Sequence, residues 1–137
     1  MKVCAVLKSF WPSLITLAVI LYATLSPNPA LAEDMPPIPH LDKLIHAVMF
    51  GGLYGALVFD VYRKRKSENI QACPDRRIML LLAAGVVAFS ILDEIMQKEL
   101  TTNRSAEFLD LLADWIGVCV AFFSAPPAVR AVLRIEK

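Results

Sequence analysis

Three apolar stretches of this 137-residue chain each carry a pair of polar side chains four residues apart. Residues at positions i and i+4 lie on one face of a helix, so each pair would project in one direction. Carboxylates beside a histidine can perform general acid–base catalysis, and carboxylates beside lysine or arginine can form ion pairs or hold a charged ligand. This candidate polar cluster consists of the pairs Asp42 with His46, Asp93 with Gln97 and Asp110 with Asp114, and of the neighbouring Lys43, Glu94 and Arg104.

The position of these residues inside apolar runs makes them candidates for function. A charged side chain at the centre of a membrane helix costs about 2.5–3.5 kcal/mol or more unless it is paired or hydrated. Asp114 would lie about 13 Å along a helix that starts near Ser105, which makes it the deepest of the set. We therefore expect a polar pocket that opens at one end of a helical bundle and extends into the membrane.

Each candidate also has a purely structural interpretation. Asp42 could cap the N-terminus of a helix. His46 could be a hydrogen-bonded histidine of the bundle, a proton carrier or a metal ligand. Arg104 could bridge carboxylates in a structural network or bind a phosphate. The residue types alone leave these alternatives open.

The composition indicates an all-α integral membrane protein. Hydrophobic residues make up 57% of the chain, above the roughly 45–50% typical of soluble domains. None of the apolar runs alternates with period two, so helices are expected rather than barrel strands. The predicted four-helix bundle has helices at about 8–25, 42–62, 76–97 and 106–125, with Pro126 and Pro127 ending the last one.

The distribution of charge predicts the orientation of this bundle. Of the 14 lysines and arginines, all except Lys43, Lys98 and Arg104 fall at the end that contains both termini and the 63–66 basic loop. The positive-inside rule therefore places both termini in the cytoplasm and the polar cluster at the outer face. The formal net charge of +1 gives no general footprint for nucleic acid, so we expect no nucleic-acid partner.

A secretory signal peptide is the rival interpretation of residues 1–32. Lys2 and Lys8 precede an apolar run, and Ala30-Leu31-Ala32 resembles a signal-peptidase cleavage site. Cleavage there would leave three helices, whereas retention gives four.

Two glycines on the second helix form a small-xxx-small pattern, Gly51 and Gly55. Small residues with this spacing let helix backbones approach closely. Packing within the bundle is the expected role, with a homodimer through Gly51 and Gly55 as the alternative.

An ordered set of short motifs resembles the VanZ-like family. The motifs are His40 to His46, Leu92 to Gln97, and Arg104 through Asp110 and Asp114 to Gly117, after an opening Trp11-Pro12 helix. The resemblance implies that residues 1–137 form a single VanZ-like domain in the bacterial cytoplasmic (inner) membrane. The family is named after a protein associated with lowered sensitivity to teicoplanin. Asp114 stands where the family commonly has asparagine, and this adds negative charge to the expected pocket.

Together with the polar cluster, the resemblance implies a cell-envelope accessory or binding protein, linked to glycopeptide (teicoplanin) tolerance. Its expected partner is a membrane lipid or a lipid-linked envelope precursor, and no cofactor is expected. The alternative is an enzyme that acts on a lipid-linked or phospholipid head group at the outer face, with paired carboxylates and a histidine and with or without a metal. No hydroxyl or thiol is spaced as an obvious nucleophile.

Overall fold

The computed structural model describes residues 9–26, 40–70, 74–100 and 108–135, and this part of the chain is all-helical. Its four helices are α2 (Trp11–Leu25), α4 (Leu41–Ser67), α5 (Arg76–Leu100) and α6 (Phe108–Leu133). The last three are long and apolar enough to cross a membrane. Helix α2 is apolar but has only 15 residues, which is about 22 Å and short of the roughly 30 Å hydrocarbon core. The prediction of an all-α, multi-pass membrane protein is therefore confirmed.

The helix ends differ from the predicted ends at two places on α4. The helix continues through the basic 63–66 segment to Ser67, which places Lys64, Arg65 and Lys66 in its last turn. Cations are favourable there because they face the negative end of the helix dipole. At the other end the N-cap residue is His40, in a left-handed conformation, and Asp42 lies inside the first turn. The capping role considered for Asp42 was therefore wrong.

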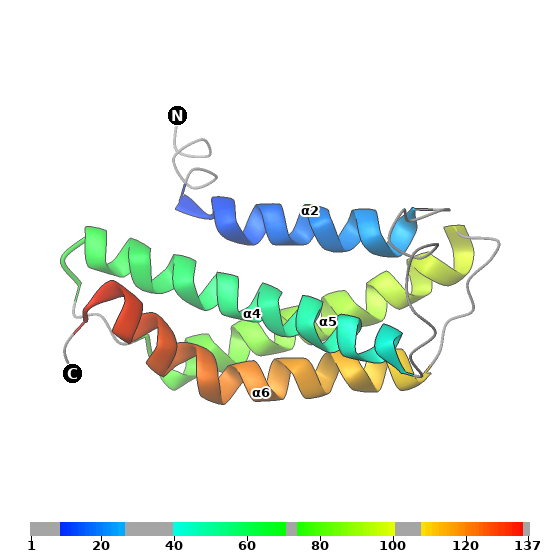
Figure 1. Cartoon of the computed structure of the whole chain (residues 1–137). Helices are drawn as coiled ribbons and strands as arrows, with labels where there is room; N and C mark the ends of the chain where they lie inside the picture. Colours follow the sequence, from blue (N-terminus) through cyan, green and yellow to red (C-terminus); the bar gives the residue numbers. More distant parts are fainter. Residues whose placement is uncertain (1–8, 27–39, 71–73, 101–107, 136–137) are drawn as a thin grey trace.

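The prediction that Pro126 and Pro127 end the last helix was also wrong. Both prolines lie inside α6, which runs on to Leu133. A proline removes one helical hydrogen bond and bends the helix, and it does not have to terminate a helix whose remaining turns are packed. Val129, two residues beyond Pro127, belongs to the buried core. Figure 1 shows α6 changing direction towards its C-terminal end, drawn in red.

Helix α4 lies at the centre of the bundle and contacts each of the other helices. Helix α6 lies along one side of it and α2 along another, while α5 crosses behind them obliquely (Figure 1). Three hydrophobic side chains on α4, those of Phe50, Tyr54 and Val58, are completely buried. The apolar core therefore forms around α4.

Helices α4 and α6 approach each other closely at a pair of glycines. A Cβ atom added at Gly51 would lie 2.8 Å from the carbonyl oxygen of Gly117, and one added at Gly117 would overlap the backbone of Ala47. The nearest neighbour of Gly55 on this face is Ala125, also on α6. Because α6 covers this face, a homodimer through Gly51 and Gly55 is not supported, and the packing role is the one observed.

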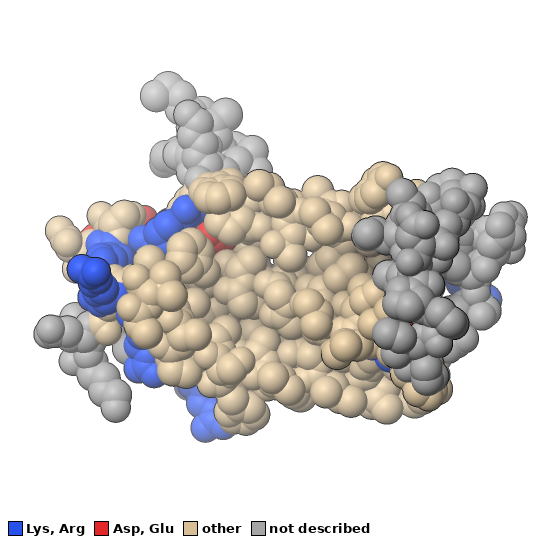
Figure 2. Space-filling view, viewed as in Figure 1, with Lys and Arg blue, Asp and Glu red and all other residues tan. Residues whose placement is uncertain are grey.

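The two ends of the bundle differ in chemistry. Lysines and arginines gather where α4 ends and α5 begins, and the middle of the face in view shows uncharged residues (Figure 2). The first residues of α4, the last residues of α5 and the first residues of α6 meet at the opposite end (Figure 1). The candidate polar cluster lies on these three segments, so the chain has a basic end and a polar-cluster end.

Candidate functional site

One buried contact of the polar cluster joins α4 to α6. His46 Nδ1 lies 3.0 Å from Asp114 Oδ1, and Asp114 is only 1% exposed. When Asp114 is ionised its carboxylate can only accept, so the imidazole then donates through Nδ1 and its Nε2 is left outside this bond. The ring stacks against Phe50 one turn further along α4. The close crossing at Gly51 and Gly117 brings the two helices near enough for the pair to form.

A second contact joins α2 to α5. Asp93 accepts a hydrogen bond from the Thr24 hydroxyl at 2.9 Å and another from Gln97 Nε2 at 3.1 Å. Asp93 is 1% exposed, and Thr24 is completely buried. The Asp93–Gln97 pair therefore lies on one face of α5, as its spacing predicted, and that face meets α2.

These two contacts belong to one polar region. The carboxyl groups of Asp93 and Asp114 are close enough to interact electrostatically. Glu94 and Asp110 interact in the same way with the His46 imidazole. Polar groups from α2, α4, α5 and α6 thus converge at the same end of the bundle.

The outer edge of the cluster is formed by a lysine between two carboxylates. Lys43 Nζ lies 3.1 Å from Asp42 and 3.2 Å from Asp110. Asp42 is more than half exposed, whereas Lys43 and Asp110 are mostly covered. The exposed fraction of the side chains therefore decreases from Asp42, at the edge of the cluster, to Asp114, inside the bundle.

The structure brings together every predicted site residue that it describes. Arg104, predicted as a partner of the carboxylates, lies outside the described residues, as does Ser105. Sequence reasoning missed Thr24, because a single threonine in an apolar helix carries no signal that pairs it with a carboxylate 69 residues away. The contact depends on how α2 is placed, which only the fold determines.

Another buried carboxylate, also not assigned to a site by the sequence, lies at the basic end. Asp60 is completely buried and accepts hydrogen bonds from the backbone N–H and the hydroxyl of Ser13, at 3.1 and 2.5 Å. Arg63, one turn along α4, approaches the other carboxylate oxygen at 3.2 Å. Hydrogen bonds to Asp60 thus join α2 to α4 at the basic end, and the hydrogen bond to Asp93 joins α2 to α5 at the other end.

The buried carboxylates are held in place by partners within the chain. Among the described residues, Trp115 Nε1 is the only buried side-chain nitrogen or oxygen that lacks a hydrogen-bond partner. The same part of the chain contains no group of three or more histidine, cysteine or acidic residues arranged to hold a metal ion. The described cluster is therefore a preformed hydrogen-bonded network that offers charged groups at its edge and an oriented imidazole inside.

The balance of charge in the described cluster is negative. It contains five carboxyl groups, one lysine and one histidine: Asp42, Asp93, Glu94, Asp110 and Asp114 against Lys43 and His46. Such a group would attract a cation or the cationic part of a zwitterion more strongly than a bare anion.

No protein-family model, functionally characterised protein or solved structure matches this chain significantly. The fold and the site therefore define the class of protein by themselves. The chain is an all-helical, multi-pass membrane protein with a buried network of carboxylates at one end of its bundle.

Proposed function

We propose that this chain is a VanZ-like protein of the bacterial cytoplasmic membrane that binds a component of the cell envelope through its polar cluster. In this proposal both termini are cytoplasmic, and the polar cluster faces outwards. The concentration of lysine and arginine at the opposite end supports that orientation, because positively charged segments remain on the cytoplasmic side.

The observation that carries the proposal is the burial of three acidic residues, Asp93, Glu94 and Asp114, at one end of membrane-spanning helices. Ionisable groups are expensive at such positions and are found mainly where they serve a ligand or transport path. The network already satisfies its inner carboxylates, so the ligand would meet the cluster from its exposed edge at Asp42 and Lys43.

The ligand class follows from the charge of the cluster. An excess of carboxylates favours an amine or a zwitterionic head group, and the edge lysine Lys43 can contact a phosphate. A lipid-linked envelope precursor or a phospholipid head group combines these features. Binding such a component would link the protein to tolerance of teicoplanin, which acts on the cell envelope.

Glycopeptide susceptibility in a bacterial host tests this proposal. Wild type and Glu94→Gln are expressed at matched membrane abundance, and teicoplanin is compared with vancomycin. The matched control is Glu68→Gln, which makes the same chemical change at an exposed position of the basic end. Selective protection that Glu94→Gln loses and Glu68→Gln keeps would support the proposal. Equal loss in both variants, or no protection by a correctly inserted wild type, would contradict it.

The His46–Asp114 pair favours a second candidate, an enzyme that acts on a lipid head group. A carboxylate bonded to Nδ1 orients an imidazole so that Nε2 can accept or donate a proton. This candidate predicts turnover of a lipid substrate by the purified protein and loss of that turnover in His46→Gln. Absence of turnover with phospholipids and lipid-linked precursors would contradict the enzyme and favour the binding function.

A further inference from the structure

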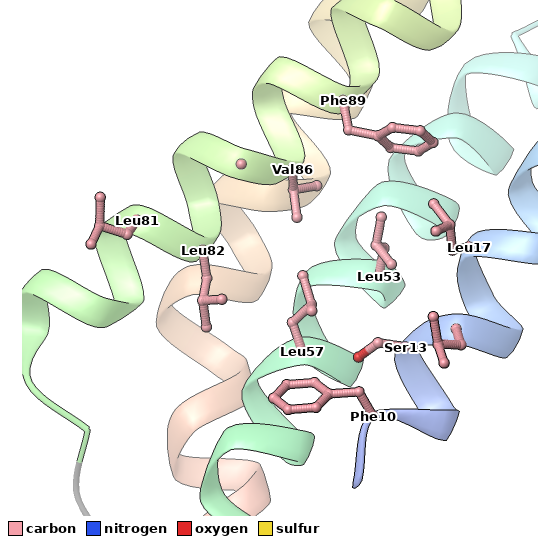
Figure 3. A pocket seen from close by; sticks show the side chains of 11 residues that line it. Phe10, Ser13, Leu17, Leu53, Leu57, Leu81, Leu82, Val86 and Phe89 are labelled. Carbon is pink, nitrogen blue, oxygen red and sulfur yellow. The ribbon is translucent and has the colours of Figure 1, made fainter. Parts of the chain in front are cut away.

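A groove separate from the polar cluster runs between α2 and α5, with α4 as its floor (Figure 3). Its volume is about 430 Å³, within the roughly 300–1,000 Å³ of typical small-molecule sites. The groove is open along one side of the bundle rather than enclosed. Its walls are apolar and include Leu17, Leu53, Leu57, Leu82, Val86 and Phe89.

The groove begins at the basic end and reaches into the middle of the bundle. Phe10 and Ser13, near the start of α2, line its beginning, and Phe89, on α5, lines its other end. On α5 the lining extends from Leu81 to Phe89, which corresponds to about 12 Å of helix. Half of the hydrocarbon core is about 15 Å thick. The depth of the groove therefore matches one leaflet of the membrane, which is the region that an acyl chain occupies.

Two cationic side chains lie where the groove meets the basic end. The Lys64 ammonium group lies 5.9 Å from the centre of the Phe10 ring, which lines the groove. The Arg63 guanidinium lies 5.9 Å from the centre of the neighbouring Trp11 ring. The start of the apolar groove is thus flanked by positive charge.

Arg63 is held in place and keeps hydrogen-bond donors available. Its Nη2 donates to the Ser9 carbonyl and to Asp60, and the side chain is 31% exposed. A guanidinium has five N–H donors. Because these hydrogen bonds to described residues all use Nη2, the donors on Nη1 and Nε remain for an anion at the mouth of the groove.

We propose that this groove binds an anionic glycerophospholipid, with one acyl chain between α2 and α5 and the phosphate at Lys64 and Arg63. A helix from a second copy is the competing occupant of an apolar groove. Copies of one membrane protein share the same orientation, so a second copy would bring its own basic end against Lys64 and Arg63. Like charges would oppose that contact, whereas an anionic head group complements it.

Native mass spectrometry of the detergent-solubilised protein tests this proposal. The protein is titrated with phosphatidylglycerol and, separately, with phosphatidylcholine, and the lipid-bound fraction gives a dissociation constant for each. We expect wild type to prefer phosphatidylglycerol. Lys64→Gln should reduce that preference about fivefold, the factor that corresponds to the contribution of one basic residue near an anionic surface. Lys98→Gln, at the opposite end, should leave it unchanged.

Glycine substitutions test the groove itself. Gly85 lines the groove, and a Cβ atom added there meets no atom within 4 Å, so a side chain can start from this position, and we expect the ring of Gly85→Phe to occupy the groove. Gly52, on α4, has the same free space but does not line the groove, which makes Gly52→Phe the matched control. Gly85→Phe should weaken the binding of both lipids at least as much as Lys64→Gln weakens that of phosphatidylglycerol, and Gly52→Phe should not.

Three outcomes would overturn the proposal. One is a folded Gly85→Phe variant, with unchanged thermal unfolding, that binds phosphatidylglycerol like wild type. Another is equal affinity of wild type for the two lipids. The third is a dimer mass that Gly85→Phe abolishes, since this would make a second copy the occupant. If Gly85→Phe does not fold, the smaller Gly85→Leu is measured against Gly52→Leu with the same expectations.

Discussion

Thr24 and Asp93 are 69 residues apart in the chain, and their side chains form a buried hydrogen bond of 2.9 Å between α2 and α5. This bond lies at the same end of the bundle as the His46–Asp114 pair, and Asp93 and Asp114 interact electrostatically. Helix α2 is therefore part of the polar network, although the sequence places no charged residue in it.

Replacing Thr24 tests this role of α2. Thr24→Val keeps the shape of the side chain and removes the hydroxyl, so Asp93 loses one of its donors while it remains buried. We expect a loss of stability of about 1–2 kcal/mol, measured by SDS titration in mixed micelles. The control is Thr16→Val, because among the described residues the Thr16 hydroxyl bonds to the Pro12 carbonyl of its own helix and to no carboxylate.

The same experiment distinguishes a retained α2 from a cleaved signal peptide. Cleavage after Ala32 would remove Thr24 together with Ser13, the partner of buried Asp60. Thr24→Val would then not change the stability of the mature protein, and the intact mass would lack residues 1–32. A destabilised variant of full mass would instead show that α2 stays in the bundle.

The crossing of α4 and α6 should tolerate no side chain at Gly117. A Cβ atom there would overlap the Ala47 backbone, so Gly117→Ala must separate the two helices. We expect a loss of at least about 2 kcal/mol, within the range seen for overpacked cores. Gly52→Ala should be neutral or stabilising by up to about 1 kcal/mol, because it improves helix propensity at a position with free space. Equal stabilities of the two variants in the SDS titration would contradict this packing.

Asp60 should be the most sensitive carboxylate at the basic end. It is completely buried and pairs with Ser13 and Arg63. Its removal leaves the backbone N–H and the hydroxyl of buried Ser13 without their acceptor, and an unsatisfied buried donor costs about 1–3 kcal/mol. We therefore expect Asp60→Ala to lower the melting temperature markedly, whereas Glu68→Ala, at an exposed position of the same end, should leave it unchanged.

The His46–Asp114 contact predicts energetic coupling between the two residues. In a double-mutant cycle of His46→Gln and Asp114→Asn, the combined loss of stability should differ from the sum by about 0.5–3 kcal/mol, as is typical of residues in contact. Pairing His46→Gln with Asp60→Asn gives the reference cycle, because Asp60 lies at the other end of the bundle. Additivity in both cycles would mean that the buried pair does not act as a unit.

The sequence by itself determined the helical class and the separation of charge. Long apolar runs without period-two alternation can only satisfy their backbone groups in a membrane as helices, and three of them reach spanning length. The spacing of Asp93 and Gln97 also correctly predicted one face of α5, because an i,i+4 pair depends only on the local geometry of a helix.

Tertiary structure decided which of these helix faces meet and how each charge is compensated. The pairing of His46 with Asp114, of Asp93 with Thr24 and of Asp60 with Ser13 joins residues far apart in the chain. Such contacts depend on the crossing and rotation of whole helices, which the Gly51–Gly117 approach sets between α4 and α6. The apolar groove has the same origin, since it exists only because α2 and α5 lie apart over α4. Local spacing carries no information about either feature.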